Sequence, residues 1–152
     1  MGRKTEQHRR RKGAEAKTPH EAYVDTSAFI AFLDSSDSFH QTFKRLFSSP
    51  PSLIASTLVI AEGHGWFLKR YDKNRAAEFL AFVEAFPALR LQGFDTNELA
   101  KARRMCARFG DQKLTLADAH GLVIMHDRRH AACWSTDRHL SLTGVSLVIT
   151  LT

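Results

Sequence analysis

The segment Ala22-Tyr23-Val24-Asp25-Thr26-Ser27 determines the expected architecture of this chain. Its first three residues predict a short buried strand, and Asp-Thr-Ser supplies residue types that often begin helices. Ala28 to Leu33 then continues as a largely apolar run, which predicts a helix directly after the strand. A buried strand followed at once by a helix is typical of a parallel sheet covered by helices.

Strands and helices alternate through the rest of the chain. Further strands are expected at residues 52–55, 89–91, 131–134 and 145–149. Further helices are expected at residues 39–47, 58–71, 74–86 and 95–109, and from Thr115 through Met125. We therefore predict an α/β protein, a three-layer α/β/α sandwich around a central parallel sheet of four to five strands.

Charge is unevenly distributed along the chain. The 152 residues carry a net charge of +6, and residues 1–20 alone carry seven Lys or Arg against two Glu, a net charge of +5. Because this segment is almost without apolar residues, we predict a basic disordered tail at residues 1–20 and one folded domain at residues 21–152. Two roles stay open for the tail: attraction to a polyanion, or a solubilising extension.

Composition excludes several classes of protein. No apolar run reaches the ~18 residues of a membrane span, and the basic N-terminus lacks the hydrophobic stretch of a secretory signal. We therefore expect a cytoplasmic protein, in which Cys106 and Cys133 are buried free thiols. No Cys-x-x-Cys pair, Walker loop or dinucleotide-binding loop is present.

Four carboxylates stand where a parallel sheet would bring them together. Asp25 ends the first strand and Asp137 follows the strand at 131–134, and ligands of such sheets sit at the carboxyl ends of strands. Glu62 lies on the helix after the second strand, and Asp118 lies in the first turn of the helix that begins at Thr115. Clustered carboxylates repel one another unless a cation joins them, and oxygen ligands favour Mg²⁺ or Mn²⁺.

Each carboxylate also has a structural alternative. Asp25 has the type and position of a helix N-cap, and Asp118 stands three residues after Thr115, as in a capping box. Glu62 is also compatible with a solvated helix residue, and Asp137 with a turn. The sequence leaves both sets of roles open.

Five segments, taken in order, resemble the PIN-domain family. They are Val24 to Ala28, Asp34 to His40, Ser56 to Glu62, Leu114 to Ala119 and Thr136 to Leu140. The last departs from the family pattern, which commonly has an aromatic residue where Leu140 stands. The resemblance spans Tyr23 to about Thr150 and is greatest to compact bacterial and archaeal members, many of which are VapC-type toxins.

The resemblance implies a metal-dependent endoribonuclease acting on single-stranded RNA. Asp25, Glu62 and Asp118 would bind one Mg²⁺ or Mn²⁺, and Asp137 would hold it through water or help a second ion. The metal would polarise a phosphodiester and activate a water molecule for attack. Thr26 has two expected roles, orienting a ligand or capping a helix. An antitoxin and a homodimer are implied as partners by the resemblance alone.

Two other functions compete with this prediction. The first is a catalytically inactive PIN-like module that binds RNA or protein, although a degenerate site would be expected to lose at least one carboxylate. The second is a phosphatase or phosphoacceptor with Asp25 as nucleophile. Phosphatases of that kind need a second Asp two positions later, where this chain has Ser27.

Two further features favour structural roles. His126 and His130 have the spacing of helical metal ligands, but their polar neighbours favour a solvated helix end that attracts cations. Gly63 and Gly65 interrupt an expected helix, which indicates close packing by another element or a kink. The expected aromatic core comprises Trp66, Phe67, Phe79, Phe82 and Phe86.

Overall fold

The computed structural model describes residues 21–150, and the predicted tail at residues 1–20 lies outside the described residues. The strands are β1 (Glu21–Val24), β2 (Ser52–Ser56), β3 (Leu89–Gln92), β4 (Ala132–Trp134) and β5 (Ser146–Leu147). The helices are α1 (Thr26–Leu33), α2 (His40–Ser48), α3 (Thr57–Arg70), α4 (Lys73–Ala85), α5 (Thr96–Arg108) and α6 (Leu116–Arg128), with short 3₁₀ helices η1 (Arg138–Ser141) and η2 (Val148–Thr150).

All neighbouring strands of the five-stranded sheet are parallel, in the order β3-β2-β1-β4-β5. Strand β1 is central: Tyr23 is in register with Ile54 of β2 on one side and with Cys133 of β4 on the other. The chain adds strands in one direction up to β3 and then crosses to the other side of β1. The strand order therefore reverses between β1 and β4, the place where open α/β sheets bind ligands.

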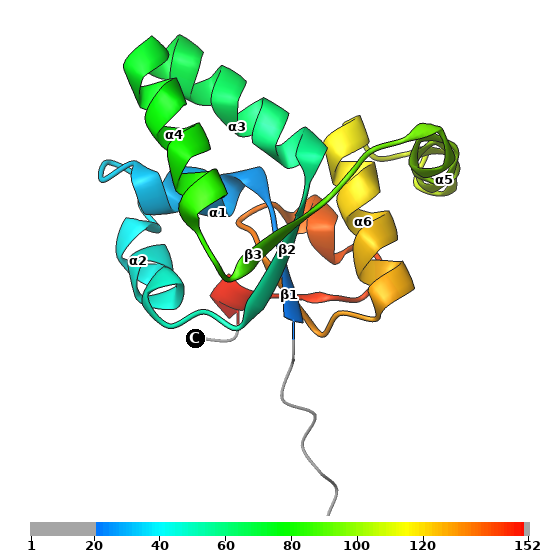
Figure 1. Cartoon of the computed structure of the whole chain (residues 1–152). Coiled ribbons are helices and arrows are strands. Elements are labelled where there is room, and N and C mark those ends of the chain that lie inside the picture. Colours follow the sequence, from blue (N-terminus) through cyan, green and yellow to red (C-terminus); the bar gives the residue numbers. More distant parts are fainter. Residues whose placement is uncertain (1–20, 151–152) are drawn as a thin grey trace, which may run out of the picture.

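Helices cover both faces of this sheet (Figure 1). Helices α1, α2 and α4 lie on one side and α5 and α6 on the other, while α3 begins beyond the end of β2. The predicted three-layer sandwich is confirmed. Among residues 21–150, none of the helices combines the length and the apolar character of a membrane span.

The expectation of a strand at residues 145–149 is only partly correct. Strand β5 contains two residues, and the chain then turns into η2, where the Thr150 hydroxyl donates to the Leu147 carbonyl at 2.7 Å. The neighbouring strand β4 has only three residues, so it offers no backbone partners for a longer β5. The apolar character of the segment still serves the core, because Leu147 and Val148 are buried.

Two side chains at the end of α6 differ in their surroundings. His126 is exposed, as predicted for a solvated helix end. The expectation is wrong for His130, whose side chain is only 3% exposed and whose Nε2 lies 2.9 Å from Glu21 Oε1. Arg128 donates to the same Glu21 oxygen at 2.7 Å. His126 and His130 are therefore not paired as metal ligands. His130 instead contacts Glu21 at the start of β1.

The aromatic core joins α3 and α4 with α1 and α2. Phe67 and Phe79 are buried, and Trp66, Phe82 and Phe86 are partly buried and pack against the core, as predicted. The two cysteines are free: Cys133 is buried, but Cys106 is only partly so.

Gly63 allows α3 and α4 to approach closely. A Cβ atom at this position would lie 2.5 Å from the Phe79 ring, whereas a Cβ at Gly65 would meet nothing within 4 Å. The close-packing alternative is therefore confirmed for Gly63. It does not hold for Gly65.

We expect Gly63→Ala to destabilise the protein by about 1–3 kcal/mol, because the added methyl overpacks the Phe79 ring. Gly65→Ala is the matched control, with an expected gain of about 0.5–1 kcal/mol from helix propensity. Urea unfolding measures both differences. Equal effects of the two substitutions would contradict the packing role of Gly63.

Candidate metal centre

Asp25 occupies the point where the strand order reverses. Its backbone amide donates to the Trp134 carbonyl at 3.0 Å, which extends the pairing of β1 with β4 by one residue. The side chain is 5% exposed. Asp25 is also the N-cap of α1, so the structural role expected from the sequence is present.

Hydroxyl groups surround the Asp25 carboxylate. Its Oδ2 atom accepts hydrogen bonds from Ser27 Oγ and from Ser135 Oγ, both at 3.0 Å. Burial raises the pKa of Asp25, and the hydrogen bonds from Ser27 and Ser135 oppose that rise only in part. The charged carboxylate is thus held in a desolvated position, which a bound cation would stabilise.

Ser135 was not predicted as a site residue. It is fully buried after β4, where its Oγ donates to Asp25 and accepts from the Asp137 backbone amide at 2.9 Å. This one hydroxyl connects two of the predicted carboxylates. A serine in a loop gives no local signal for such a role, although its position directly after a buried strand is informative.

Glu62 extends from α3 toward the same region. Its Oε2 atom accepts a hydrogen bond from the Thr26 hydroxyl at 2.9 Å, so Thr26 positions a carboxylate. Desolvation raises the pKa of Glu62, the hydroxyl of Thr26 opposes that rise, and the charges of Asp25 and Asp118 add to it. The side chain of Glu62 still reaches solvent. Electrostatic repulsion therefore links Glu62 to Asp25 and Asp118, three of the four predicted carboxylates.

Asp118 is buried in the first turn of α6. Its Oδ2 atom accepts from the Thr115 backbone amide at 2.9 Å, and its own amide donates to Thr115 Oγ1 at 3.1 Å. The capping box expected from the sequence is therefore present. Because the box uses Oδ2, the structure leaves Oδ1 as the oxygen for a ligand.

A buried histidine fixes α6 against the sheet near Asp118. His120 is fully buried, with Nδ1 2.6 Å from Ser56 Oγ at the end of β2. Its Nε2 lies 2.9 Å from Glu98 Oε2 on α5. Burial lowers the pKa of His120, which favours its neutral form. The side chain therefore joins β2, α5 and α6 beside the candidate site.

Asp137 lies beside Asp118, together with a histidine that the sequence did not reveal. Asp118, Asp137 and His139 each offer one donor atom, and these atoms lie within 4.8 Å of one another. His139 Nδ1 is 3.2 Å from Asp137 Oδ1, which also accepts the His139 backbone amide at 2.9 Å. The predicted metal ligands were all carboxylates, so the imidazole of His139, two residues after Asp137, was not among them.

The arrangement of donors fits a hard divalent cation. Among residues 21–150, the group whose donor atoms all lie within 4.8 Å of one another is Asp118, Asp137 and His139, and it does not include Asp25 or Glu62. The repulsion acting on Glu62 still links Asp25 and Glu62 to Asp118. Carboxylate oxygens with one imidazole suit Mg²⁺ or Mn²⁺, with waters completing the ligand shell.

A cavity of about 420 Å³ opens beside these donors. Its lining includes Asp137 and His139, and it adds the Gln112 amide and the Arg138 guanidinium. A cation and an amide next to a carboxylate group could position a phosphodiester. The structure thus places a candidate metal-binding group beside a polar cavity of about 420 Å³.

Comparisons with known proteins identify a matching family and similar proteins. The PIN domain model matches residues 22–144. The 23S rRNA-specific endonuclease VapC20 of Mycobacterium tuberculosis is 27% identical over 124 residues, which cover 80% of this chain and 93% of that protein. Ribonuclease VapC26 of the same species is 28% identical over 117 residues, which cover 76% and 85%.

Two solved structures share the fold. The crystal structure of Mycobacterium tuberculosis VapC20, described as a sarcin-ricin loop cleaving toxin, matches with a TM-score of 0.75 and 22% identity over 82% of this chain and 95% of that one. PAE2754 from Pyrobaculum aerophilum matches with a TM-score of 0.63 and 20% identity over 88% and 93%. At these identities the two structures support the fold alone.

Burial of Asp25 predicts an unusual pH dependence of stability. Because the folded-state pKa of Asp25 is raised, its contribution to stability is full below the unfolded pKa of about 4 and is lost as pH rises through the folded value. We expect Asp25→Asn to unfold at a higher temperature than wild type at neutral pH without metal. That advantage should disappear in acid.

Thermal unfolding with EDTA and with Mn²⁺ measures this effect. Mn²⁺ should stabilise wild type more than Asp25→Asn, because the variant lacks one charged ligand. Glu84→Gln, on the exposed face of α4, is the control with the same chemical change. A metal-free Asp25→Asn variant that is less stable than wild type at neutral pH would show that the buried charge is not destabilising.

Proposed function

The chain belongs to the PIN domain family, and we propose that it is a metal-dependent endoribonuclease that hydrolyses phosphodiester bonds of single-stranded RNA. The observation that carries the proposal is the convergence of carboxylates from β1, α3, α6 and the segment after β4. The names of the relatives, an rRNA-specific endonuclease and a ribonuclease, support RNA as the substrate class.

In this proposal Asp25, Glu62 and Asp118 bind Mg²⁺ or Mn²⁺, and Asp137 holds the ion through water or helps a second ion. When bound, the cation supplies Lewis acidity toward a phosphodiester and makes a water nucleophilic at neutral pH. We further propose His139 as a ligand or close neighbour of the ion, on the basis of its place in the three-donor group. An imidazole favours Mn²⁺ over Mg²⁺.

The protein's own hydroxyl groups would position the carboxylates. Ser27 and Ser135 donate to Asp25, which leaves its second oxygen for the metal. Thr26 donates to Glu62 from the first turn of α1. Each of these is a positioning residue, since it acts through a carboxylate and needs no contact with RNA.

Arg138 and Gln112 would bind substrate beside the metal. Both line the cavity that contains Asp137, where a guanidinium would pair with a phosphate oxygen and an amide could contact a base or ribose. A toxin role, an antitoxin partner and a homodimer remain parts of the proposal that rest on the relatives' names and the family resemblance. Light scattering of the purified protein tests the dimer directly.

Cleavage of labelled single-stranded RNA with Mn²⁺ tests the activity. We expect cleavage by wild type, and a loss of at least about 100-fold in Asp25→Asn and Glu62→Gln, because each removes a charge that binds the metal. EDTA should abolish cleavage. Glu84→Gln should cleave like wild type.

Two results would count against this proposal. Equal cleavage by Asp25→Asn and wild type would indicate a contaminant or a different site. Binding of Mn²⁺ and RNA without cleavage under any condition would favour the catalytically inactive binding module.

The role proposed for His139 has a separate test. We expect His139→Asn to weaken Mn²⁺ binding by roughly 10-fold, with a smaller effect on Mg²⁺, because the imidazole is the softer ligand. Calorimetric titration of each ion into metal-free protein measures both affinities without relying on activity. His64→Asn, a partly exposed histidine on α3, is the control. Unchanged Mn²⁺ affinity in His139→Asn would exclude His139 from the ligand set.

A further inference from the structure

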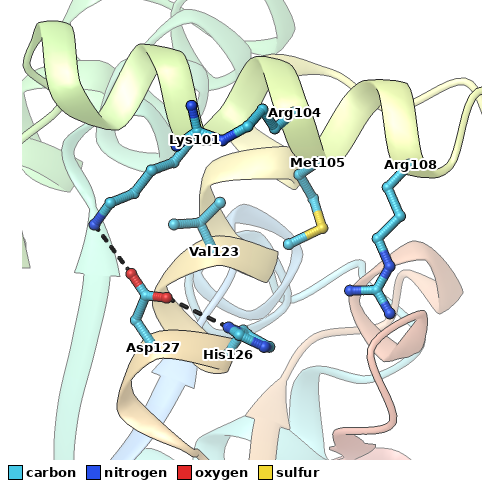
Figure 2. Close-up of a pocket in the computed structure, with 7 residues that line it drawn as sticks. All are labelled: Lys101, Arg104, Met105, Arg108, Val123, His126 and Asp127. Carbon is cyan, nitrogen blue, oxygen red and sulfur yellow. Dashed lines mark hydrogen bonds and ion pairs between the residues drawn. The ribbon is translucent and has the colours of Figure 1, made fainter.

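A groove of about 300 Å³ lies between α5 and α6 (Figure 2). Three cationic side chains of α5 line it: Lys101, Arg104 and Arg108. Their spacing of three and four residues places them on one face of the helix, in steps of roughly 4.5–6 Å along its axis. The groove is distinct from the cavity beside the candidate metal centre, whose lining comes from other residues.

Within residues 21–150, acidic side chains pair with only one of these three cations, Lys101. Lys101 Nζ lies 3.1 Å from Asp127 Oδ2 and 3.3 Å from Glu98 Oε1. Within residues 21–150, neither Arg104 nor Arg108 has an acidic partner. Two guanidinium groups on one groove are therefore available to an external anion.

The remaining lining of the groove is partly apolar. Met105 and Val123 form the apolar part of the groove, and they are 8% and 4% exposed because they pack α5 against α6. Their role in the core is therefore already accounted for. Around this apolar floor stand the polar side chains of the groove, which are Lys101, Arg104 and Arg108 of α5 and His126 and Asp127 of α6.

The groove also lies in the most basic part of the folded domain. Residues 101–129 contain seven Lys or Arg and three Asp, a net charge of +4. The rest of residues 21–152 contains eight basic and eleven acidic side chains, a net charge of −3. The nearly neutral total thus divides into a basic range, which favours binding of a polyanion, and an acidic remainder that includes Glu98 in the first turn of α5.

The row of cations leads toward the candidate metal centre. Arg108 is the last residue of α5, and a short connection joins it to α6, whose first turn holds Asp118. Gln112, within that connection, lines the cavity beside the metal ligands. A chain of phosphates that starts at the metal centre can therefore continue past Gln112 to Arg108 and then along α5.

We propose that the α5–α6 groove binds the RNA backbone outside the scissile bond, with Arg108 and Arg104 each contacting a phosphate. This inference rests on the proposed ribonuclease function. The contacts release counterions and do not read bases, so they add affinity without sequence preference. The other candidate occupant, an acidic protein segment, is separated from RNA by the test below.

The double variant Arg104→Ala/Arg108→Ala tests the groove, with Arg103→Ala as the control on the same helix. Arg103 is exposed and does not line the groove. Binding of a labelled single-stranded RNA of about 20 nucleotides is measured in EDTA, so that neither metal nor cleavage contributes. All three proteins keep residues 1–20, and melting temperatures confirm that each is folded.

We expect the double variant to bind RNA roughly 10-fold more weakly than wild type, equally for unrelated sequences. The slope of log affinity against log salt should fall by about 1.4, the value for two lost phosphate contacts on a single strand. In cleavage assays with Mn²⁺ the loss should appear in KM more than in kcat, and should shrink for a trinucleotide. Arg103→Ala should show a much smaller change in affinity.

The outcomes separate the two proposals. If wild type cleaves RNA but the double variant binds it no more weakly than Arg103→Ala does, the groove proposal is wrong and the ribonuclease proposal stands. If the double variant binds RNA normally and instead loses binding to a polyglutamate peptide, the groove is a protein-docking site. If wild type neither binds nor cleaves RNA, both proposals fail.

Discussion

The backbone hydrogen bond from Asp25 to Trp134 joins the ends of β1 and β4 at 3.0 Å, and the candidate site depends on this pairing. These two strands are separated by more than one hundred residues in the chain, yet they are neighbours in the sheet. Their pairing brings Ser135 within 3.0 Å of the Asp25 carboxylate, and Ser135 in turn binds the Asp137 amide. A sheet with another strand order would not bring Asp25 and Asp137 to one place.

The carboxylates are brought together at the expense of stability. Burial raises the pKa of Asp25, and desolvation together with neighbouring charges raises the pKa of Glu62. Hydroxyl groups reduce this penalty without adding charge, since Ser27, Ser135 and Thr26 each donate to one of these two carboxylates. The remaining repulsion is available to stabilise a bound cation, so a weakened apo state and metal affinity have the same physical origin.

Local patterns in the sequence predicted most of the fold. Apolar runs and capping residues located the helices and four of the five strands closely, because these signals come from neighbouring residues. Residues 145–149 were expected to form a longer strand, because strand length depends on a partner that local sequence does not reveal. The strand order and the position of α6 depend on distant contacts such as that of His120 with Ser56.

The same distinction applies to the site. Asp25, Asp118 and Asp137 carried local signals, since each follows a strand or lies in the first turn of a helix, and each also takes part in capping a helix. Ser135 and His139 carried none, because their roles depend on groups that approach only in the folded protein. Family resemblance supplied the connection between the four carboxylates that local chemistry left open.

Charge separation would allow one small domain to combine a carboxylate cluster with the proposed binding of RNA. The metal centre is acidic, so a phosphate group approaching it without a cation would be repelled. Residues 101–129, which carry a net charge of +4, offer that phosphate chain a favourable surface nearby. A metal ion would then control binding at the candidate metal centre, and the salt concentration would control binding to the cations of residues 101–129. The nearly neutral charge of the whole folded domain is therefore a poor guide to how it would bind a polyanion, which depends on where the two signs of charge lie.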